Sequence, residues 1–258
     1  MIFDTYIAKL GAFADRQRVS GKRITAWRAP IDVEELLSSL PVRFGAGANP
    51  GVVLRGDTYL ELGNPEAGSA EITVFTENVN LISDGKITLI GPDLGEVAGA
   101  SLPFGQITIL GGRSLCQADH DRLHAAGIVG DRIEGYMVRS VPNAIWSRIS
   151  KAAAAKGFCF EALGRALMAL YRANCPDIEA IAIVFVTSGA DAVAELGSIA
   201  AQVREIRREL VREKWAIRGY VIECATGCSN CGDKRVCDDI REVLKMRLES
   251  RAQRATDA

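Results

Sequence analysis

The sequence predicts an α+β (mixed α/β) fold: a mixed sheet with flanking helices, and a C-terminal cysteine-rich loop that is followed by a helix. Three observations support this fold class. Short β-branched segments follow one another from Val52 to about Leu110 without a helical pattern between them. Before Val52 and after about Leu110, apolar residues recur mainly at the spacing of an α-helix. Residues 178–187 form an almost wholly apolar run, which is typical of a central strand covered on both faces.

Helical and extended patterns alternate over the N-terminal part of the chain. Apolar residues recur at helical spacing after Phe3, which predicts an amphipathic helix. Asp32 and Glu35 form a capping-box pattern, in which the two side chains satisfy free backbone N–H groups at the start of a helix. The elements predicted here are a helix over 3–18, a strand over 24–27 and a helix over 32–40.

The sequence from residue 52 to residue 110 predicts short strands separated by turn residues. Because no helical pattern lies between them, we expect an antiparallel or mixed sheet. Ser83-Asp84-Gly85 predicts a hairpin turn, since Asp-Gly tolerates positive φ. The glycine-rich stretch 45–51 lacks the Gly-Lys-Ser/Thr ending of a phosphate-binding P-loop, so a plain loop is favoured. The predicted strands are 52–55, 58–62, 71–76, 86–90 and 106–110.

The second half predicts mainly helices, with two further strands between them. Residues 143–157 are alanine-rich and predict a helix that includes Trp146 and Arg148. The last predicted strand leads the chain into a cysteine-rich loop. The other elements expected are a helix over 160–174, a strand over 178–187, a helix over 190–215, a strand over 217–222 and a helix from 238 onward.

Composition limits the class of protein. The chain has 258 residues, of which 48% are hydrophobic and 24% charged, and its formal net charge is −1. Nucleic acid is not expected as the main partner, because the chain has no basic excess. We expect no membrane partner and no signal peptide, since no uninterrupted apolar stretch reaches about 18 residues and the N-terminus has no basic segment. A cytoplasmic protein is expected, and the sequence leaves homo-oligomerisation open.

The most specific spacing is that of Cys224, Cys228, Cys231 and Cys237, which follow the pattern C-x3-C-x2-C-x5-C. Four thiolates this close in sequence can converge on one metal centre, and soft sulfur ligands select zinc or an iron–sulfur cluster. The set is too compact for the two separated knuckles of a zinc ribbon. Short gaps between cysteines favour [4Fe–4S] ligation, and the spacing leaves zinc open as the alternative.

The other cysteines and the two histidines have less specific settings. Cys116, Cys159 and Cys175 lie among apolar neighbours, which predicts buried structural thiols. His120 and His124 are four residues apart and would share one face of a helix, where they could bind a metal. A solvated helix surface is favoured, since no third ligand is evident nearby.

Seven stretches of the chain occur in the same order in a known protein family. They are Asp84-Gly85-Lys86, Ile90-Gly91-Pro92-Asp93, Leu102-Pro103-Phe104-Gly105, Gly112-Arg113, Arg132-Ile133-Glu134-Gly135, Ile145-Trp146-Ser147-Arg148-Ile149-Ser150-Lys151 and Ala155-Lys156-Gly157-Phe158. In this series the chain resembles the CO-methylating acetyl-CoA synthase family, the β subunit of carbon monoxide dehydrogenase/acetyl-CoA synthase. The similarity covers roughly residues 50–240 and implies three regions. These are an α+β domain over 1–222 that resembles the family's middle domain, a cysteine-rich metal-binding loop with a C-terminal helix over 223–250, and a tail over 251–258.

The resemblance implies a metal cluster. The family makes acetyl-CoA from a methyl group, CO and coenzyme A at a [4Fe–4S] cubane that a cysteine bridges to two nickel ions. Cys228 and Cys231 match the C-x2-C opening of the family's cluster loop, Cys237 matches a later ligand, and Cys224 could supply the fourth thiolate. No cysteine follows Cys237 to match the family's Cys-x-Cys nickel element, and no counterpart of the family's large N-terminal domain is recognised. The resemblance therefore implies a cubane without the dinickel centre.

The resemblance also implies a contact with coenzyme A. The family's middle domain carries a Trp- and Arg-rich surface near its coenzyme A site, and Trp146 and Arg148 match that pattern. Arg113 and Arg139 are expected as neighbours. Guanidinium groups pair well with phosphate, and an indole can stack on adenine. Core packing of the tryptophan and simple surface charge on the arginines are the alternative.

Three functions are consistent with these features. The first is an iron–sulfur protein that acts as an electron-transfer or accessory component beside a corrinoid or CO dehydrogenase-type partner in anaerobic one-carbon metabolism, with coenzyme A as a further ligand. The second is a structural or assembly module that binds zinc on the same four sulfurs. The third is a modified acyl-transfer enzyme that recruits nickel through a partner's ligands. The sequence leaves open whether the protein is an enzyme, and it identifies no catalytic residue.

Overall fold

The computed structural model describes the greater part of the chain. It divides the chain into two compact units, Met1–Val203 and Arg204–Ala258, and every contact discussed below lies within the first unit. For residues 139–141 and 208–217 it describes only the backbone. The residues described are 2–44, 53–97, 101–116, 119, 122–123, 133–141, 144–217, 242 and 246.

A mixed five-stranded sheet forms the larger of two β layers. Its strands are β1 (Ile24–Arg28), β3 (Ser69–Thr76), β4 (Lys86–Ile90), β6 (Phe104–Gly111) and β9 (Ala180–Val186). In space they follow the order β1-β4-β9-β6-β3. The β4–β9 and β6–β3 pairs are parallel, and the β1–β4 and β6–β9 pairs are antiparallel. Strand β9 lies at the centre and is almost wholly buried, which confirms the prediction made from its apolar run.

The second β layer is a four-stranded sheet. Its strands are β2 (Thr58–Leu62), β5 (Ser101–Leu102), β7 (Tyr136–Val141) and β8 (Ala144–Ser150), in the spatial order β5-β2-β8-β7. Only the short β5 runs parallel to its neighbour, while β2, β8 and β7 are antiparallel. Both sheets are mixed or antiparallel, and the α+β fold class predicted from the sequence is confirmed.

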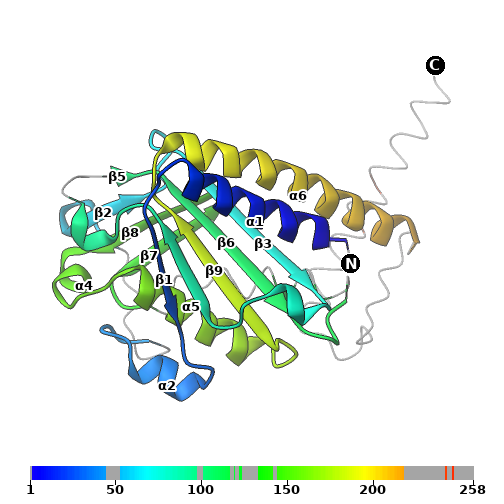
Figure 1. The fold of residues 1–258 in the computed structure, drawn as a ribbon, viewed down its shortest axis with the longest axis horizontal. Helices are drawn as coiled ribbons and strands as arrows, with labels where there is room; N and C mark the ends of the chain where they lie inside the picture. Colours follow the sequence, from blue (N-terminus) through cyan, green and yellow to red (C-terminus); the bar gives the residue numbers. More distant parts are fainter. Residues whose placement is uncertain are drawn as a thin grey trace. The chain divides into compact units, whose positions relative to one another are not determined.

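Helices cover the two faces of the five-stranded sheet (Figure 1). α1 and the first part of α6 lie side by side on one face, and α5 lies on the other. The face toward α5 is an aromatic core, where the ring centroid of Phe160 lies 5.0 Å from that of Phe185 and 5.8 Å from that of Phe104. The α-helices are α1 (Asp4–Val19), α2 (Val33–Ser38), α4 (Lys151–Ala155), α5 (Phe160–Asn174) and α6 (Ala190–Ile217), and the 3-10 helices are η1 (Arg55–Asp57), η2 (Val79–Leu81) and η3 (Leu94–Glu96).

One predicted helix is wrong. Residues 143–157 were expected to be helical, but the structure has strand β8 followed by the five-residue helix α4. Along β8, half-buried and fully buried residues alternate, with Ile145, Ser147 and Ile149 turned inward. This two-residue period is the signature of a strand. The run of alanines that suggested a helix begins only after Ser150, whose hydroxyl accepts a hydrogen bond from the Ala153 N–H and caps α4.

Two local predictions in the first half are also wrong. The segment 52–55 does not form a strand, because its described residues lead into the 3-10 helix η1. Ser83-Asp84-Gly85 forms a turn but not a hairpin, since β3 pairs with β6 and β4 pairs with β1 and β9. Asp84 connects three elements of the fold instead of closing a hairpin. Its carboxylate accepts hydrogen bonds from the Ile181 N–H at 2.9 Å and from Arg172 at 2.8 Å, and so ties the start of β4 to β9 and α5.

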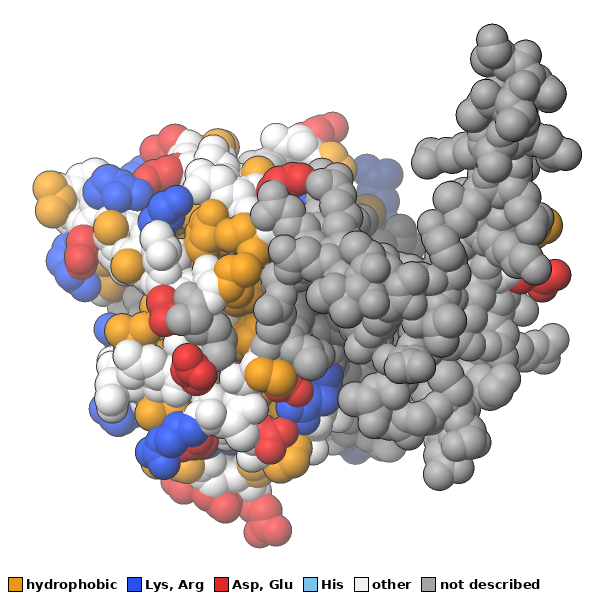
Figure 2. Space-filling model, turned by 90° about the vertical axis from the view of Figure 1, so that its right-hand side faces the viewer, with side chains coloured by type: hydrophobic (Ala, Val, Ile, Leu, Met, Phe, Trp, Pro, Cys, Tyr) orange, Lys and Arg blue, Asp and Glu red, His pale blue; other side chains and the backbone are white. Residues whose placement is uncertain are grey.

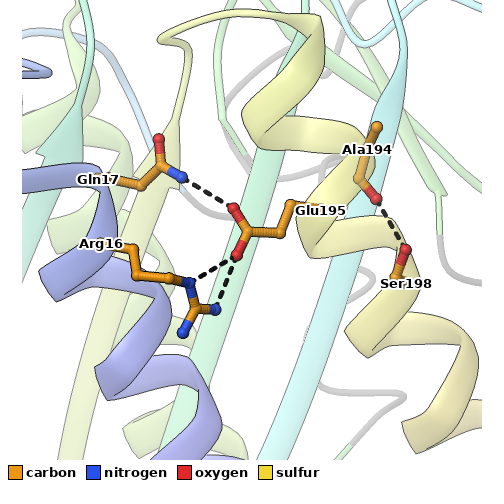
Figure 3. A network of polar contacts seen from close by, with 5 residues as sticks. All are labelled: Arg16, Gln17, Ala194, Glu195 and Ser198. Carbon is orange, nitrogen blue, oxygen red and sulfur yellow. Dashed lines mark hydrogen bonds and ion pairs between the residues drawn. The ribbon is translucent and has the colours of Figure 1, made fainter. Parts of the chain in front are cut away.

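α1 is held against α6 by a group of polar contacts (Figure 3). Arg16 donates to one carboxylate oxygen of Glu195 at 2.9 and 2.7 Å, and Gln17 donates to the other at 3.0 Å. Nearer the start of α1, Lys9 donates to the side chain of Gln202 of α6 at 2.8 Å. These contacts join α1 to α6.

The described surface is of mixed charge. On the face drawn in Figure 2, basic and acidic side chains are interspersed, in keeping with a net charge of −1. Among the described residues, no helix is long and apolar enough to cross a bilayer. The glycine-rich stretch 45–51 and residues 218–222 of the strand predicted over 217–222 lie outside the described residues, and Ile217 is the last residue of α6.

Candidate functional site

The four cysteines of the predicted metal centre, Cys224, Cys228, Cys231 and Cys237, lie outside the described residues, as do His120 and His124. Among the residues whose placement is given, no group of His, Cys, Asp and Glu could hold a metal ion. The donor set itself suits the group predicted for it, since four thiolates match either a cubane or a zinc ion. The metal assignment therefore stays a prediction from the sequence.

The three other cysteines have different environments. Cys175 is buried and Cys159 is half-buried, and burial raises the pKa of both thiols, so neither is an activated nucleophile. The prediction that Cys116 is buried is wrong, because its side chain is exposed in the turn after β6. Its backbone N–H donates to Asp119 at 2.9 Å, and buried Leu115, one residue earlier, anchors the turn.

Strand β8 places Trp146 and Arg148 on the same face of the four-stranded sheet. They are two residues apart, and both belong to the half-buried set that alternates with the inward-facing residues. The inward face is occupied by buried residues such as Ser147, and by the buried Tyr136 of the neighbouring strand β7, whose pKa burial raises. A strand thus brings together the two residues that a helix would have placed about 200° apart.

A pocket of about 550 Å³ opens on this face. That volume lies within the range usual for small-molecule sites. Trp146 and Arg148 form part of its wall, and the other residues come from η1, β2, the turn after β2 and β5. The pocket is lined by Arg55, Thr58, Tyr59, Glu61, Asn64, Pro65, Glu66, Ser101, Trp146 and Arg148.

The centre of the pocket is an ion pair stacked on an indole ring. Arg148 lies opposite Glu61 in the antiparallel register of β8 and β2, and its Nε donates to Glu61 Oε1 at 2.7 Å. Both side chains are 19% exposed, so solvent screens the pair only in part. The guanidinium carbon of Arg148 lies 5.0 Å from the centre of the Trp146 ring, within the range of a cation–π contact. Two flat groups are therefore already stacked in the pocket.

Charge in the pocket is balanced. Arg55 and Arg148 supply two positive charges, and Glu61 and Glu66 supply two negative charges. A ligand phosphate that approached Arg148 would have to compete with Glu61 for the guanidinium. The pocket therefore suits a ligand that combines a flat ring or an amide chain with a limited number of phosphates.

The two remaining predicted ligand residues lie in different places. Arg139 stands opposite Trp146 in the register of β7 and β8, so its backbone belongs to the same sheet as the pocket. Arg113 lies in the turn after β6 in the other sheet and does not line the pocket. Its side chain is 77% exposed and lies 3.4 Å from the carboxylate of Glu179. Two of the four predicted residues thus line one pocket, and a third is their neighbour along the sheet.

Sequence reasoning missed the pocket residues contributed by β2 and the turn after it. Glu61 was not singled out, although the strand that carries it was predicted over 58–62. Its role depends on the register between β2 and β8, which lie more than eighty residues apart in the chain. The available signal was a Glu and an Arg at outward-facing positions of two strands. No local sequence pattern shows that these two residues lie opposite each other.

A close junction of the two sheets supports the strand that carries Trp146. The Ser69 hydroxyl at the start of β3 donates to the Ile145 carbonyl at 2.6 Å and accepts from the Ile145 N–H at 2.7 Å. Gly63 lies beside them with φ +67° and donates its N–H to Leu102 at 2.8 Å. A Cβ at Gly63 would collide with the Ile145 carbonyl oxygen, so the close approach requires glycine.

Comparison with known proteins identifies relatives of this fold. The model of a family described as "CO dehydrogenase/acetyl-CoA synthase complex beta subunit" matches residues 40–192. The chain is 33% identical over 156 residues to the carbon monoxide dehydrogenase/acetyl-CoA synthase subunit alpha of Moorella thermoacetica, covering 57% of this chain and 20% of that protein. It is 28% identical over 176 residues to the acetyl-CoA decarbonylase/synthase complex subunit beta 2 of Methanosarcina thermophila, covering 67% and 36%. It is 33% identical over 145 residues to the corresponding subunit beta of Archaeoglobus fulgidus, covering 52% and 26%.

The extent of these matches matters for the site. The chain matches between 20% and 36% of the length of these three relatives. All residues that line the pocket fall between 40 and 192, the range matched by the family model. α1, β1 and the four clustered cysteines fall outside that range. The pocket is therefore the part of the candidate site that similarity supports most directly.

Proposed function

The chain belongs to the CO dehydrogenase/acetyl-CoA synthase complex beta subunit family, and on that premise we propose that it is an iron–sulfur component of such a complex in anaerobic one-carbon metabolism. The relatives carry names that describe subunits of complexes, so a partner subunit of the CO dehydrogenase or corrinoid type is proposed for this chain as well. The chain matches only part of each relative, so the relatives' names do not tell which reaction step this chain carries out. The proposal for that step is based on the residues of the candidate site.

The observation that supports ligand binding most strongly is the pocket that contains Trp146 and Arg148 within the family-matched range. We propose coenzyme A as its ligand. The indole ring offers a flat surface for the adenine base, and the guanidinium groups of Arg55 and Arg148 offer donors for phosphate. Polar groups of Thr58, Asn64 and Ser101 on the wall can bond to the amide chain of the pantetheine arm.

The ion pair between Glu61 and Arg148 sets the affinity in this proposal. In the free protein the carboxylate occupies the guanidinium edge that a ligand phosphate would use. Binding exchanges one charged partner for another, so the net gain is smaller than for an unpaired arginine. Glu61 then acts as a counter-ion that keeps Arg148 in place over Trp146 and limits how tightly phosphates bind.

Glu61→Gln is expected to tighten coenzyme A binding about tenfold, and Arg148→Ala is expected to weaken it by about tenfold or more. The first change frees the guanidinium for phosphate, and the second removes it. Isothermal titration with coenzyme A, dephospho-coenzyme A and pantetheine measures both effects and shows which part of the ligand each residue contacts. Removal of the ligand phosphates should abolish the gain seen in Glu61→Gln.

The matched control for this pair of variants is Glu179→Gln, which removes the partner of Arg113 outside the pocket lining. Unchanged affinity is expected for this control, and a change would extend the ligand site to Arg113. If Arg148→Ala binds all three ligands as tightly as the unaltered protein, Arg148 has no part in binding and the pocket is not a coenzyme A site.

The second part of the proposal is one [4Fe–4S] cluster on Cys224, Cys228, Cys231 and Cys237. Such a cluster supplies one-electron transfer when it is bound. The chain's own contribution is the set of four thiolates together with Lys234 and Arg235, whose positive charges lie between the third and fourth cysteines and can offset the negative charge of the cluster.

Protein purified without oxygen is expected to contain about four iron and four acid-labile sulfide per chain, with neither zinc nor nickel in stoichiometric amount. Elemental analysis and sulfide determination measure this directly. One zinc ion without sulfide would replace the electron-transfer proposal with a structural or assembly module. Stoichiometric nickel would instead support a modified acyl-transfer enzyme.

A further inference from the structure

A groove of about 190 Å³ lies between α1 and the part of the five-stranded sheet next to it. Figure 1 shows β1 and β4 extending beyond the helices that cover this face of the sheet. The α1 wall is formed by Leu10 and by a row of four residues, Ile7, Gly11, Ala14 and Arg18, spaced i, i+4, i+7 and i+11. The floor is apolar and half-buried, with Ile24, Ala182 and Val184 among its residues.

α1 is held by contacts on its sides away from the groove. The opposite side of α1 is bonded to α6 through Arg16, Gln17 and Glu195 (Figure 3). A second contact joins Lys9 to Gln202. These contacts span about two turns of the helix, and at the start of α1 the Phe3 ring packs edge-on against Phe75 of β3, with 5.2 Å between the ring centroids. The row of residues that faces the groove is therefore held in place.

Gly11 widens the groove at the middle of α1. Glycine in a helix interior is less favourable than alanine, so a glycine at this position suggests a structural or functional requirement. A Cβ built on Gly11 meets no atom of the described residues within 4 Å, so their packing does not require glycine there. Glycine on a helix face allows another backbone or a bulky side chain to approach closely.

The rim of the groove is basic. Lys86 lines the groove, and Arg28 lies directly opposite it in the antiparallel register of β1 and β4. Like charges at such positions repel, which destabilises the strand pair. Both side chains are exposed, and neither forms an ion pair with another residue that the structure describes. Arg18, 63% exposed, adds a third positive charge, and Asp15 at 2.8 Å offsets it in part.

We propose that this groove is a docking site for an apolar segment of a partner protein subunit that carries carboxylates beside its apolar residues. The floor and Gly11 accept the apolar side chains, and Arg28 and Lys86 pair with the carboxylates. The surface depends on α1 and β1, which precede residue 40, where the family match begins. It is independent of the coenzyme A pocket, whose lining residues belong to the other sheet and its connections.

Fluorescence anisotropy with two labelled synthetic peptides tests the proposal on the full 258-residue chain. One is an amphipathic helical peptide with leucine on one face and glutamate elsewhere, and the other has lysine in place of glutamate. The glutamate peptide is expected to bind at least about tenfold more tightly, with a difference that shrinks as salt is raised. Lys86→Glu together with Arg28→Glu should reverse the preference. Both side chains are exposed, so the fold should tolerate these changes.

Gly11→Met should fill the groove and weaken binding of the glutamate peptide about tenfold. Gly197→Met is the matched control, because Gly197 is also a helical glycine with no atom within 4 Å of its Cβ position and does not line the groove. The proposal is overturned if the glutamate peptide does not bind, if both peptides bind equally, or if Gly11→Met binds the glutamate peptide as well as Gly197→Met does. None of these outcomes bears on coenzyme A affinity, which is measured separately.

Discussion

Gly63→Ala is expected to lower the free energy of unfolding by about 2–4 kcal/mol and to weaken coenzyme A binding in the protein that remains folded. Two effects add. Residue 63 has φ +67°, where an L side chain is strained, and its new Cβ would collide with the Ile145 carbonyl oxygen. To relieve that contact, β8 would have to move away from β2 and β3 at the residue that precedes Trp146. The pocket wall would move with it.

Urea denaturation and isothermal titration measure the two consequences of Gly63→Ala. Gly95→Ala is the matched control, because a Cβ there meets no atom within 4 Å and its φ is not positive. The control should change the unfolding free energy by no more than about 0.5 kcal/mol. If Gly63→Ala is as stable as Gly95→Ala, the close junction between β8 and the turn after β2 is not a structural requirement.

Cys231→Ala is expected to abolish most metal binding and to lower the melting temperature of the protein. A cubane that loses one of four thiolate ligands is exposed to solvent and oxygen, and the binding free energy of a metal centre in a small loop is also folding free energy for that loop. Iron and sulfide determination after anaerobic purification, together with thermal unfolding, measures the effect. The loss should extend to the following helix, which the sequence predicts to begin next to Cys237.

Cys116→Ala is the matched control for Cys231→Ala. It removes a cysteine that is exposed and lies outside the predicted ligand set, so metal content and melting temperature should stay unchanged. Retention of full metal content and of the melting temperature in Cys231→Ala would show that the four-cysteine assignment is wrong. Equal loss in both variants would point to a general effect of cysteine removal and would contradict the assignment as well.

Elements with a long and unambiguous period could be predicted from the sequence. α5 runs from Phe160 to Asn174 as expected, and the apolar run over 178–187 contains the central strand β9. The helix predicted over 190–215 extends two residues further, to Ile217. In each case the pattern covers enough residues for burial on one face, or on both, to decide between helix and strand.

Elements whose conformation depends on distant partners could not be predicted. In the segment 144–150 the alternation of Ile145, Ser147 and Ile149 is short, and the alanines that follow outweighed it. The extended form is stabilised by pairing with β2 and β7, which no local pattern reveals. The same limit explains the false hairpin at Asp84, whose carboxylate binds Arg172 and the backbone of β9 nearly a hundred residues later.

The candidate site shows the same division. Trp146 and Arg148 were found because they belong to a series of residues that resembles a family, and they do line one pocket. Glu61 was not found, because its pairing with Arg148 exists only once β2 and β8 are in register. Arg113 belongs to the same series and was expected as their neighbour, but the structure places it in the turn after β6 of the other sheet.

The position of β9 in the sheet has a consequence for synthesis of the chain on the ribosome. β4 and β6 both pair with β9 and not with each other, yet β9 is the last strand of the five to be translated. Until residue 186 has left the exit tunnel, β4 and β6 expose unpaired, apolar strand edges. Nascent chains that stop before residue 180 should therefore aggregate or depend on chaperones, whereas chains that extend well past 203 should not.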